Sequence, residues 1–242
     1  MQKFGIDISK WQGDFPMDAA IQSDGVEFAI IKAGGSDKLA PYTDARFEGN
    51  YYKAKKAGIN VGAYWYSKAM SVEDAKRDAE YFYKLLKGKQ FDLPVYIDVE
   101  EKSQLNLGKD KLTSIIDAFL SYLENLGYYV GIYSSSSYFK TYMDDNYLKK
   151  YAHWIAAWGT KKPDGAGVWQ FGGETNKIRS NKIQGMTVDQ DYLYVDYPSV
   201  IKAKKLNGYG VDNTVRDALL KLHEMGYTYN VIQETLNTLK GV

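Results

Sequence analysis

Short apolar runs alternate with helical patterns over the first 150 residues, and this rhythm constrains the fold more than any other feature of the chain. The runs have the length of buried strands, and they are FGIDIS (4–9), FAIIKAG (28–34), VGAYWYS (61–67), PVYIDVE (94–100) and YVGIYSS (129–135). Between them, apolar residues recur at helical spacing in residues 45–57, 71–88 and 112–127. Strands that alternate with helices of this length form βαβ units and a parallel sheet.

Beyond about residue 151 the rhythm changes to strands with little room for helices. Three more runs follow, and they are HWIAAWG (153–159), GVWQFGG (167–173) and MTVDQDYL (186–193). Eight strands suggest a closed barrel. We therefore predict the α/β class, with an irregular eight-stranded β/α barrel of five β/α units and then three strands, and a small C-terminal helical module. In such barrels the active site lies at the C-terminal ends of the strands.

The pattern divides the chain into three segments. Residues 1–199 hold the eight predicted strands, and residues 200–210 are polar with two glycines, which predicts a linker. Residues 211–242 carry apolar residues at helical spacing. A helical segment this short is too small for an easily stable core of its own. We therefore expect it to dock on the barrel or to pair with a second copy of the chain as a homodimer.

The composition excludes several classes of protein and of site. The net charge of +1 leaves no basic stripe for nucleic acid. Cysteine is absent and histidine occurs twice, so we expect no disulfide, no metal site and no cofactor. No apolar run reaches the roughly 18 residues of a membrane span, which predicts no membrane insertion. The N-terminal MQKFGIDIS lacks the apolar core of a signal peptide, so we expect synthesis in the cytoplasm without one.

Acidic residues follow the ends of several predicted strands. Asp98 and Glu100 lie two residues apart at the end of the fourth strand, so both point to one face with Cα atoms roughly 6.6 Å apart. Asp7 lies in the first strand, and Asp189 and Asp191 lie in the last. Acids are rarely buried without partners or a use. Alone, each acid is better explained by a strand cap or an ion pair, but together they predict a functional cluster, with Asp191 serving the turn.

Aromatic side chains surround these acids in the predicted barrel. The chain has 22 Tyr and 5 Trp, and rings with a polar edge suit wet, shallow grooves as well as cores. The residues that we expect to contact a substrate are Tyr64, Tyr66, Tyr133, Trp11, Trp158, Trp169 and Gln170. Core packing is nearly as good an explanation for each of the tyrosines, and Trp11 is equally a groove wall or a lid. Carboxylates ringed by aromatics suit a carbohydrate cleft, because carboxylates move protons and stabilise an oxocarbenium-like centre.

The order and spacing of seven motifs resemble the lysozymes of glycoside hydrolase family 25, which includes phage endolysins and Chalaropsis-type muramidases. The motifs lie within residues 3–198, and they are GIDISKWQG, GAYWYS, PVYIDVE, GIYSS, WIAAW, VWQF and VDQDYL. The resemblance implies an irregular barrel of eight strands and five helices. It also implies cleavage of the β-1,4 bond between N-acetylmuramic acid and N-acetylglucosamine in bacterial peptidoglycan.

The resemblance carries roles onto four acids. It implies that Glu100 is the general acid, that Asp98 is the second catalytic carboxylate, and that Asp7 and Asp189 complete the catalytic cluster. One departure is Trp65, which stands between two tyrosines where we expect a histidine or another residue. The segment GYGVDNTVRDALLKLHEMGYTYNVIQETLN resembles a helical wall-binding repeat of the CW_7 type, with a dimerisation hairpin as the alternative.

Three alternatives to this interpretation stay open at the level of the sequence. The first is a non-catalytic peptidoglycan-binding protein on the same barrel, and the second is a barrel glycosidase that acts on chitin. The third concerns origin: we expect a phage endolysin that acts on the cell wall after release from the host, and a bacterial autolysin is the alternative.

Overall fold

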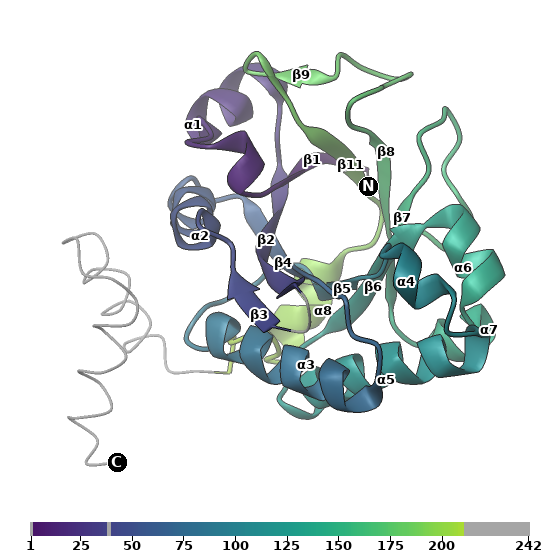
Figure 1. Cartoon of the computed structure of the whole chain (residues 1–242). Helices are drawn as coiled ribbons and strands as arrows, with labels where there is room; N and C mark the ends of the chain where they lie inside the picture. Colours follow the sequence, from purple (N-terminus) through teal and green to yellow (C-terminus); the bar gives the residue numbers. More distant parts are fainter. Residues whose placement is uncertain (1, 38–39, 211–242) are drawn as a thin grey trace, which may run out of the picture.

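Eight strands close into a barrel in the computed structural model, which describes residues 2–37 and 40–210 (Figure 1). Around the ring the order is β1, β11, β8, β7, β6, β5, β4 and β2, and β2 pairs again with β1. The strands are β1 (Lys3–Ile8), β2 (Phe28–Asp37), β4 (Asn60–Tyr66), β5 (Val95–Asp98), β6 (Val130–Ser135), β7 (Ala152–Ala156), β8 (Val168–Gly172) and β11 (Asp189–Leu193). The predicted eight-stranded α/β barrel is confirmed.

One strand of the ring runs against the others. Every neighbouring pair from β1 through β2 and on to β8 is parallel, whereas β11 is antiparallel to both β8 and β1. The first residue of β11, Asp189, therefore pairs with Asp7 near the C-terminal end of β1. The reversal of β11 places the start of this strand at the mouth where the parallel strands end.

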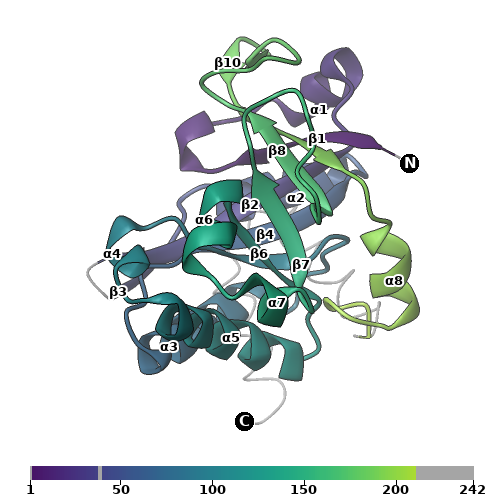
Figure 2. The same ribbon diagram turned by 90° about the vertical axis from the view of Figure 1, so that its right-hand side faces the viewer.

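Helices cover the outside of the barrel where the sequence predicts them. They are α2 (Phe47–Lys56), α3 (Val72–Leu86) and α5 (Lys109–Asn125), and they lie outside the ring of strands in Figure 1. Ser71 caps α3, since its side chain accepts a hydrogen bond from the Asp74 amide. Two helices between β6 and β7 were not predicted, namely α6 (Ser136–Tyr142) and α7 (Asp145–Leu148), which lie beside β7 in Figure 2.

The remaining elements are short. They are the helical turns at Lys10–Gln12 and Ala20–Asp24, the helices α1 (Met17–Ala19), α4 (Lys102–Leu105) and α8 (Tyr197–Ala203), and the strands β3 (Ala40–Thr43), β9 (Lys182–Ile183) and β10 (Met186–Thr187). No helix in the described part of the chain is long and apolar enough to cross a membrane.

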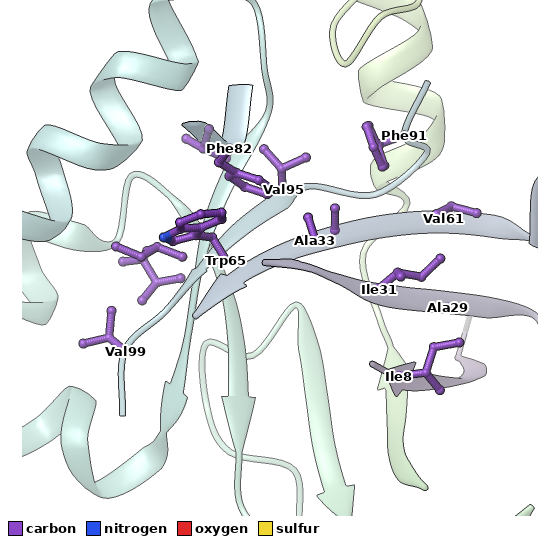
Figure 3. Close-up of a cluster of buried hydrophobic side chains, with 14 of the residues drawn as sticks. Ile8, Ala29, Ile31, Ala33, Val61, Trp65, Phe82, Phe91, Val95 and Val99 are labelled. Carbon is purple, nitrogen blue, oxygen red and sulfur yellow. The ribbon is translucent and has the colours of Figure 1, made fainter. Parts of the chain in front are cut away.

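Two apolar layers follow from the alternation of side chains along the strands. The outer layer lies between strands and helices, and Figure 3 shows Trp65 of β4 against Phe82 of α3, with ring centroids 5.8 Å apart. The departure noted at Trp65 therefore faces this helix layer. The inner layer fills the barrel with residues such as Tyr96 and Trp154, whose ring centroids lie 5.3 Å apart. The barrel is a packed core with a floor beneath its mouth.

Residues 200–210, for which the sequence predicts a linker, pack on the opposite end of the barrel. Residues 200–203 complete α8, and Ile201 is buried in the inner layer. The buried Asn207 side chain donates to the Leu93 carbonyl at 2.8 Å and accepts from the Tyr129 amide at 2.7 Å. The polar composition of this stretch comes from exposed lysines such as Lys204. The predicted module at residues 211–242 lies outside the described residues.

Candidate active site

A pocket of about 340 Å³ opens at the C-terminal mouth of the barrel. Its lining comes from the ends of the parallel strands and from the start of β11, and the residues are Asp7, Ile8, Ser9, Trp11, Gln12, Lys32, Tyr64, Tyr66, Asp98, Glu100 and Asp189. A larger groove of about 620 Å³ runs over the outside of α3 and α5, but none of the predicted site residues lines it. The chemistry that the sequence indicates therefore gathers in the smaller pocket.

All four predicted catalytic acids lie in this pocket because of strand register. Asp7 of β1 pairs with Asp189 of β11, and Asp98 of β5 lies opposite Tyr66 of β4. Glu100 follows two residues after Asp98, so side-chain alternation brings it to the same wall. Three strands distant in sequence thus place four carboxyl groups around one cavity.

Asp98 and Glu100 differ in their exposure to water. Asp98 is only 4% exposed, and burial raises the pKa of its carboxyl well above the ordinary value, with a further rise from the neighbouring Glu100. Glu100 is exposed at the mouth, yet partial desolvation within the pocket raises its pKa as well. An accessible carboxyl that holds its proton more tightly than usual is suited to protonate a bound molecule.

The pKa values of the other two acids, Asp189 and Asp7, are also raised. Burial, followed by repulsion from Glu100 and Glu174, raises the pKa of Asp189 to about 6. Burial, followed by repulsion from Asp189 and Asp191, raises the pKa of Asp7 well above its ordinary value. Burial and like charges both disfavour ionisation, so each carboxyl group of the cluster holds its proton more tightly than a free acid does.

Lys32 is a pocket residue that the sequence analysis missed. It lies on β2 with its ammonium 4.6 Å from the ring centroid of Tyr66 and 5.7 Å from that of Tyr64. Its positive charge lowers the pKa of Asp98 and of Glu100, against the effect of burial. A signal was present: Lys32 interrupts an apolar strand at the parity of Phe28 and Ile30, both of which face the barrel interior.

Gln170 links the acids to the aromatic residues. Its amide nitrogen donates to Asp7 at 2.9 Å, and its oxygen accepts from the Tyr133 hydroxyl at 2.9 Å and from the indole of Trp158 at 3.1 Å. Trp158 is 41% exposed, so part of its ring is accessible for other contacts. Tyr133 packs on Trp154 with ring centroids 4.3 Å apart and forms part of the floor.

Two tryptophans of the predicted site have opposite positions. Trp11 is 80% exposed at the rim, on a turn held by reciprocal hydrogen bonds between Ser9 and Gln12. Trp169 is not brought into the pocket: it faces the outer layer, is 3% exposed, and donates to the Ala157 carbonyl at 2.8 Å. The physical reason is parity, since Trp169 and Gln170 are adjacent on β8 and point to opposite faces.

Comparisons with known proteins agree on one family. A family model described as glycosyl hydrolases family 25 matches residues 6–178. The autolytic lysozyme of Clostridium acetobutylicum is 35% identical over 162 residues, which cover 66% of this chain and 46% of that protein. A bacterial lysozyme structure from Streptomyces coelicolor superposes with a TM-score of 0.68 at 26% identity, covering 86% of this chain and 98% of the other.

A third relative was solved with a ligand. The modular autolysin LytC of Streptococcus pneumoniae, in complex with a synthetic peptidoglycan ligand, matches with a TM-score of 0.67 and 27% identity. The match covers 80% of this chain and 47% of that one. The chain thus spans about half the length of both LytC and the Clostridium lysozyme.

Proposed function

Because the chain belongs to family 25 of the glycosyl hydrolases, we propose that it is a muramidase, which hydrolyses the β-1,4 bond between N-acetylmuramic acid and N-acetylglucosamine in bacterial peptidoglycan. One observation carries the proposal: the accessible, proton-retaining Glu100 stands beside the buried Asp98 at the barrel mouth. The lysozyme names of two relatives and the peptidoglycan ligand of a third support the choice of substrate.

Glu100 acts as the general acid in this proposal. Cleavage requires a proton on the glycosidic oxygen as its bond to the anomeric carbon breaks. Glu100 combines access to the substrate with a raised pKa, and its carboxylate then takes a proton from the incoming water in the second step. Asp7 and Asp189 complete the cluster and keep negative charge close to the developing positive centre.

Asp98 supports the substrate's own nucleophile in this proposal. Asp98 and Glu100 project from the same strand, so they are poorly placed to flank a sugar from opposite faces. The 2-acetamido oxygen of N-acetylmuramic acid attacks the anomeric carbon as the leaving oxygen departs, and water later reopens this ring. Asp98 orients the acetamido nitrogen and stabilises its positive charge. Lys32 favours the charged form of Asp98 that this role needs.

The stereochemical course tests the role of Asp98. Neighbouring-group attack retains the anomeric configuration, whereas direct attack by water from the other face inverts it. A defined muropeptide is cleaved inside the NMR tube and the anomeric proton is followed before mutarotation. We expect the β-anomer first. An initial α-anomer would exclude the acetamido path and assign Asp98 to activation of water.

Aromatic residues at the rim hold the glycan in this proposal. Trp11 and Trp158 offer exposed ring faces that suit the apolar faces of sugar rings, and Tyr64 and Tyr66 line the pocket itself. Trp169 has no part in these contacts, because it faces the outer layer.

The second candidate function is a peptidoglycan-binding protein that has the same barrel but no catalytic activity. Such a protein would not need a proton donor. Loss of turbidity in purified cell walls separates the two, with Glu100→Gln as the inactive variant. Glu124→Gln is the matched control, since Glu124 is exposed on α5 away from the mouth. Clearing by the parent and the control but not by Glu100→Gln supports the enzyme. Absence of clearing by all three proteins supports the binding protein, and equal clearing by all three would reject Glu100 as the general acid.

We propose that the C-terminal segment, residues 211–242, binds the cell wall. The division of the chain into segments 1–199, 200–210 and 211–242 is a prediction from the sequence. Because Asn207 is bonded to the barrel, the truncation that tests this role ends after Gly210. Tethering raises the local concentration of enzyme without changing the chemistry. We expect weaker binding to intact walls and unchanged turnover of soluble fragments; halving of the mass in light scattering would instead support a dimer. Phage lysin and bacterial autolysin both remain proposed origins.

A further inference from the structure

Asp191 is a completely buried acid beneath the pocket, and the proposed reaction gives it no role. It lies on β11 two residues beyond Asp189, so it points to the barrel interior one layer deeper. Its Oδ1 accepts a hydrogen bond from the indole of Trp154 at 2.7 Å. Its Oδ2 has no hydrogen-bond partner within the described part of the chain. A buried oxygen without a hydrogen-bond donor is costly. A proton bound between this oxygen and a neighbouring acceptor would supply the missing donor, which ionised carboxylates cannot do.

The adjacent carboxyl group is that of Asp7, on β1. One oxygen of Asp7, Oδ2, accepts from Gln170 at 2.9 Å. Register pairs Asp7 with Asp189 and Gly5 with Asp191, so Asp7 and Asp191 are diagonal neighbours on the same face of β1 and β11, and their carboxyl groups interact. Two ionised carboxylates both accept and cannot bond to each other. Contact between them therefore requires one proton between the two groups. Burial first, and then repulsion from Asp189, raises the pKa of both carboxyl groups, whereas the contact between them raises the pKa of Asp7 and lowers that of Asp191, in agreement with one proton held between the two.

Among the residues that the structure describes, no cation makes a direct contact with the Asp7–Asp191 pair. The titratable and charged side chains that face the pair are Asp189 on β11, Tyr64 on β4, Tyr96 and Asp98 on β5, Tyr133 on β6 and Lys32 on β2. The one cation of this group, Lys32, acts on Asp98 and Glu100. A second negative charge on the pair would thus be buried without compensation.

We propose that Asp7 and Asp191 share one proton, and that Asp191 is a positioning residue that fixes the Asp7 carboxyl in the wall of the pocket. Gln170 holds one oxygen of Asp7 from β8, and the shared proton holds the carboxyl from below. Trp154 in turn fixes Asp191. The pair carries a single negative charge, which limits repulsion on Asp189 at the mouth. The catalytic consequence rests on the proposed muramidase function, but the shared proton does not.

Thermal unfolding of Asp191→Asn tests the shared proton without any substrate. Asparagine keeps the acceptor for Trp154 and offers its own N–H to Asp7. Because the folded-state pKa lies above the unfolded value, the contribution of this pair to stability is fully present below the unfolded pKa and is lost as pH rises toward the folded pKa. The variant lacks this loss. We expect its Tm advantage over the parent to grow by about 3 °C or more between pH 5 and pH 8.

Asp164→Asn is the matched control for this measurement, because Asp164 is exposed in the loop between β7 and β8. Its Tm difference from the parent should be the same at both pH values. A Tm difference for Asp191→Asn that is equally independent of pH would overturn the shared proton.

Wall turnover by two variants tests the positioning role. Asp191→Leu fills the same space without a polar group, so Asp7 loses its lower support. We expect kcat to fall about tenfold or more with KM little changed, since the binding surface at the rim is untouched. Asp191→Asn should rescue turnover to at least a third of the parent rate. Full activity of Asp191→Leu, or failure of the rescue in a folded Asp191→Asn protein, would overturn the role. Inactivity of the parent itself would reject the proposed function and leave the thermal test decisive for the proton.

Discussion

Replacement of Glu100 by glutamine should separate catalysis from stability, because it acts on the two in opposite directions. Glutamine keeps the shape of the side chain but has no proton to donate and no charge. General acid catalysis commonly contributes a factor of about 10²–10⁴, so we expect wall turnover to fall at least about a hundredfold. The same change removes one source of repulsion from Asp98 and from Asp189.

The size of the gain in stability follows from the spacing of the two acids. At roughly 6.6 Å, the rise of two strand residues, two unit charges repel by about 2.5 kcal/mol at an effective dielectric constant of about 20 and by about 0.6 kcal/mol in water. Glu100 is exposed, so we take a screened value of about 1 kcal/mol. For a domain of this size that corresponds to a Tm increase of about 2–4 °C near neutral pH.

The sign of the pH dependence is fixed by the raised pKa values. Glu100 and Asp98 hold their protons more tightly in the folded state, so their contribution to the stability of the parent is lost as pH rises above the ordinary glutamate value of 4.5. The Tm difference between Glu100→Gln and the parent should therefore be absent at about pH 3 and open toward pH 7. Calorimetry across this range and turbidity on purified walls measure the two effects. Turnover above a third of the parent rate would contradict the role of Glu100 as general acid, and a Tm difference independent of pH would contradict its repulsion of Asp98.

Three further substitutions test other parts of the account. Lys32→Met removes the cation that lowers the pKa of Asp98 and Glu100, so the acidic limb of the pH–rate profile should move to higher pH, and Lys32→Arg should restore it. Trp11→Ala should raise KM for glycan chains about tenfold in a titration of walls while leaving Tm unchanged, because the ring is 80% exposed; an unchanged KM would remove Trp11 from the binding surface. Asn207→Ala removes the partners of the buried Leu93 carbonyl and the part-buried Tyr129 amide and places alanine at a φ of 52°, so urea unfolding should show a loss of about 2–4 kcal/mol; a loss below about 1 kcal/mol would mean that these contacts do not stabilise the barrel.

The parts of the site that could be predicted depend on local geometry. Side-chain direction along a strand is set by a period of two, so Asp98 and Glu100 on one face followed from sequence alone. The same rule was available for two misjudged positions. It excludes Trp169 once Gln170 is placed inward, and it places Lys32 with the inward-facing Phe28 and Ile30.

The parts that could not be predicted depend on closure of the barrel. The direction of β11 decides whether Asp189 reaches the mouth, and an apolar run has the same appearance in both directions. Asp191 was expected to serve a turn, yet register with Gly5 places it in the interior against Trp154. The polar stretch at 204–210 looks like a linker by composition, whereas Asn207 satisfies backbone groups of Leu93 and Tyr129 that lie over a hundred and nearly eighty residues away.

The new reducing end formed during digestion of purified peptidoglycan shows whether the protein is a muramidase. Digested walls are reduced with borohydride, hydrolysed and examined by mass spectrometry, which identifies the sugar whose anomeric carbon was released. If N-acetylmuramic acid becomes the new reducing end and Glu100 is the general acid, the parent should give muramitol and Glu100→Gln should not. Glucosaminitol would mean that the other glycosidic bond is cut, and the absence of either alcohol would mean that this barrel binds the wall without cleaving it.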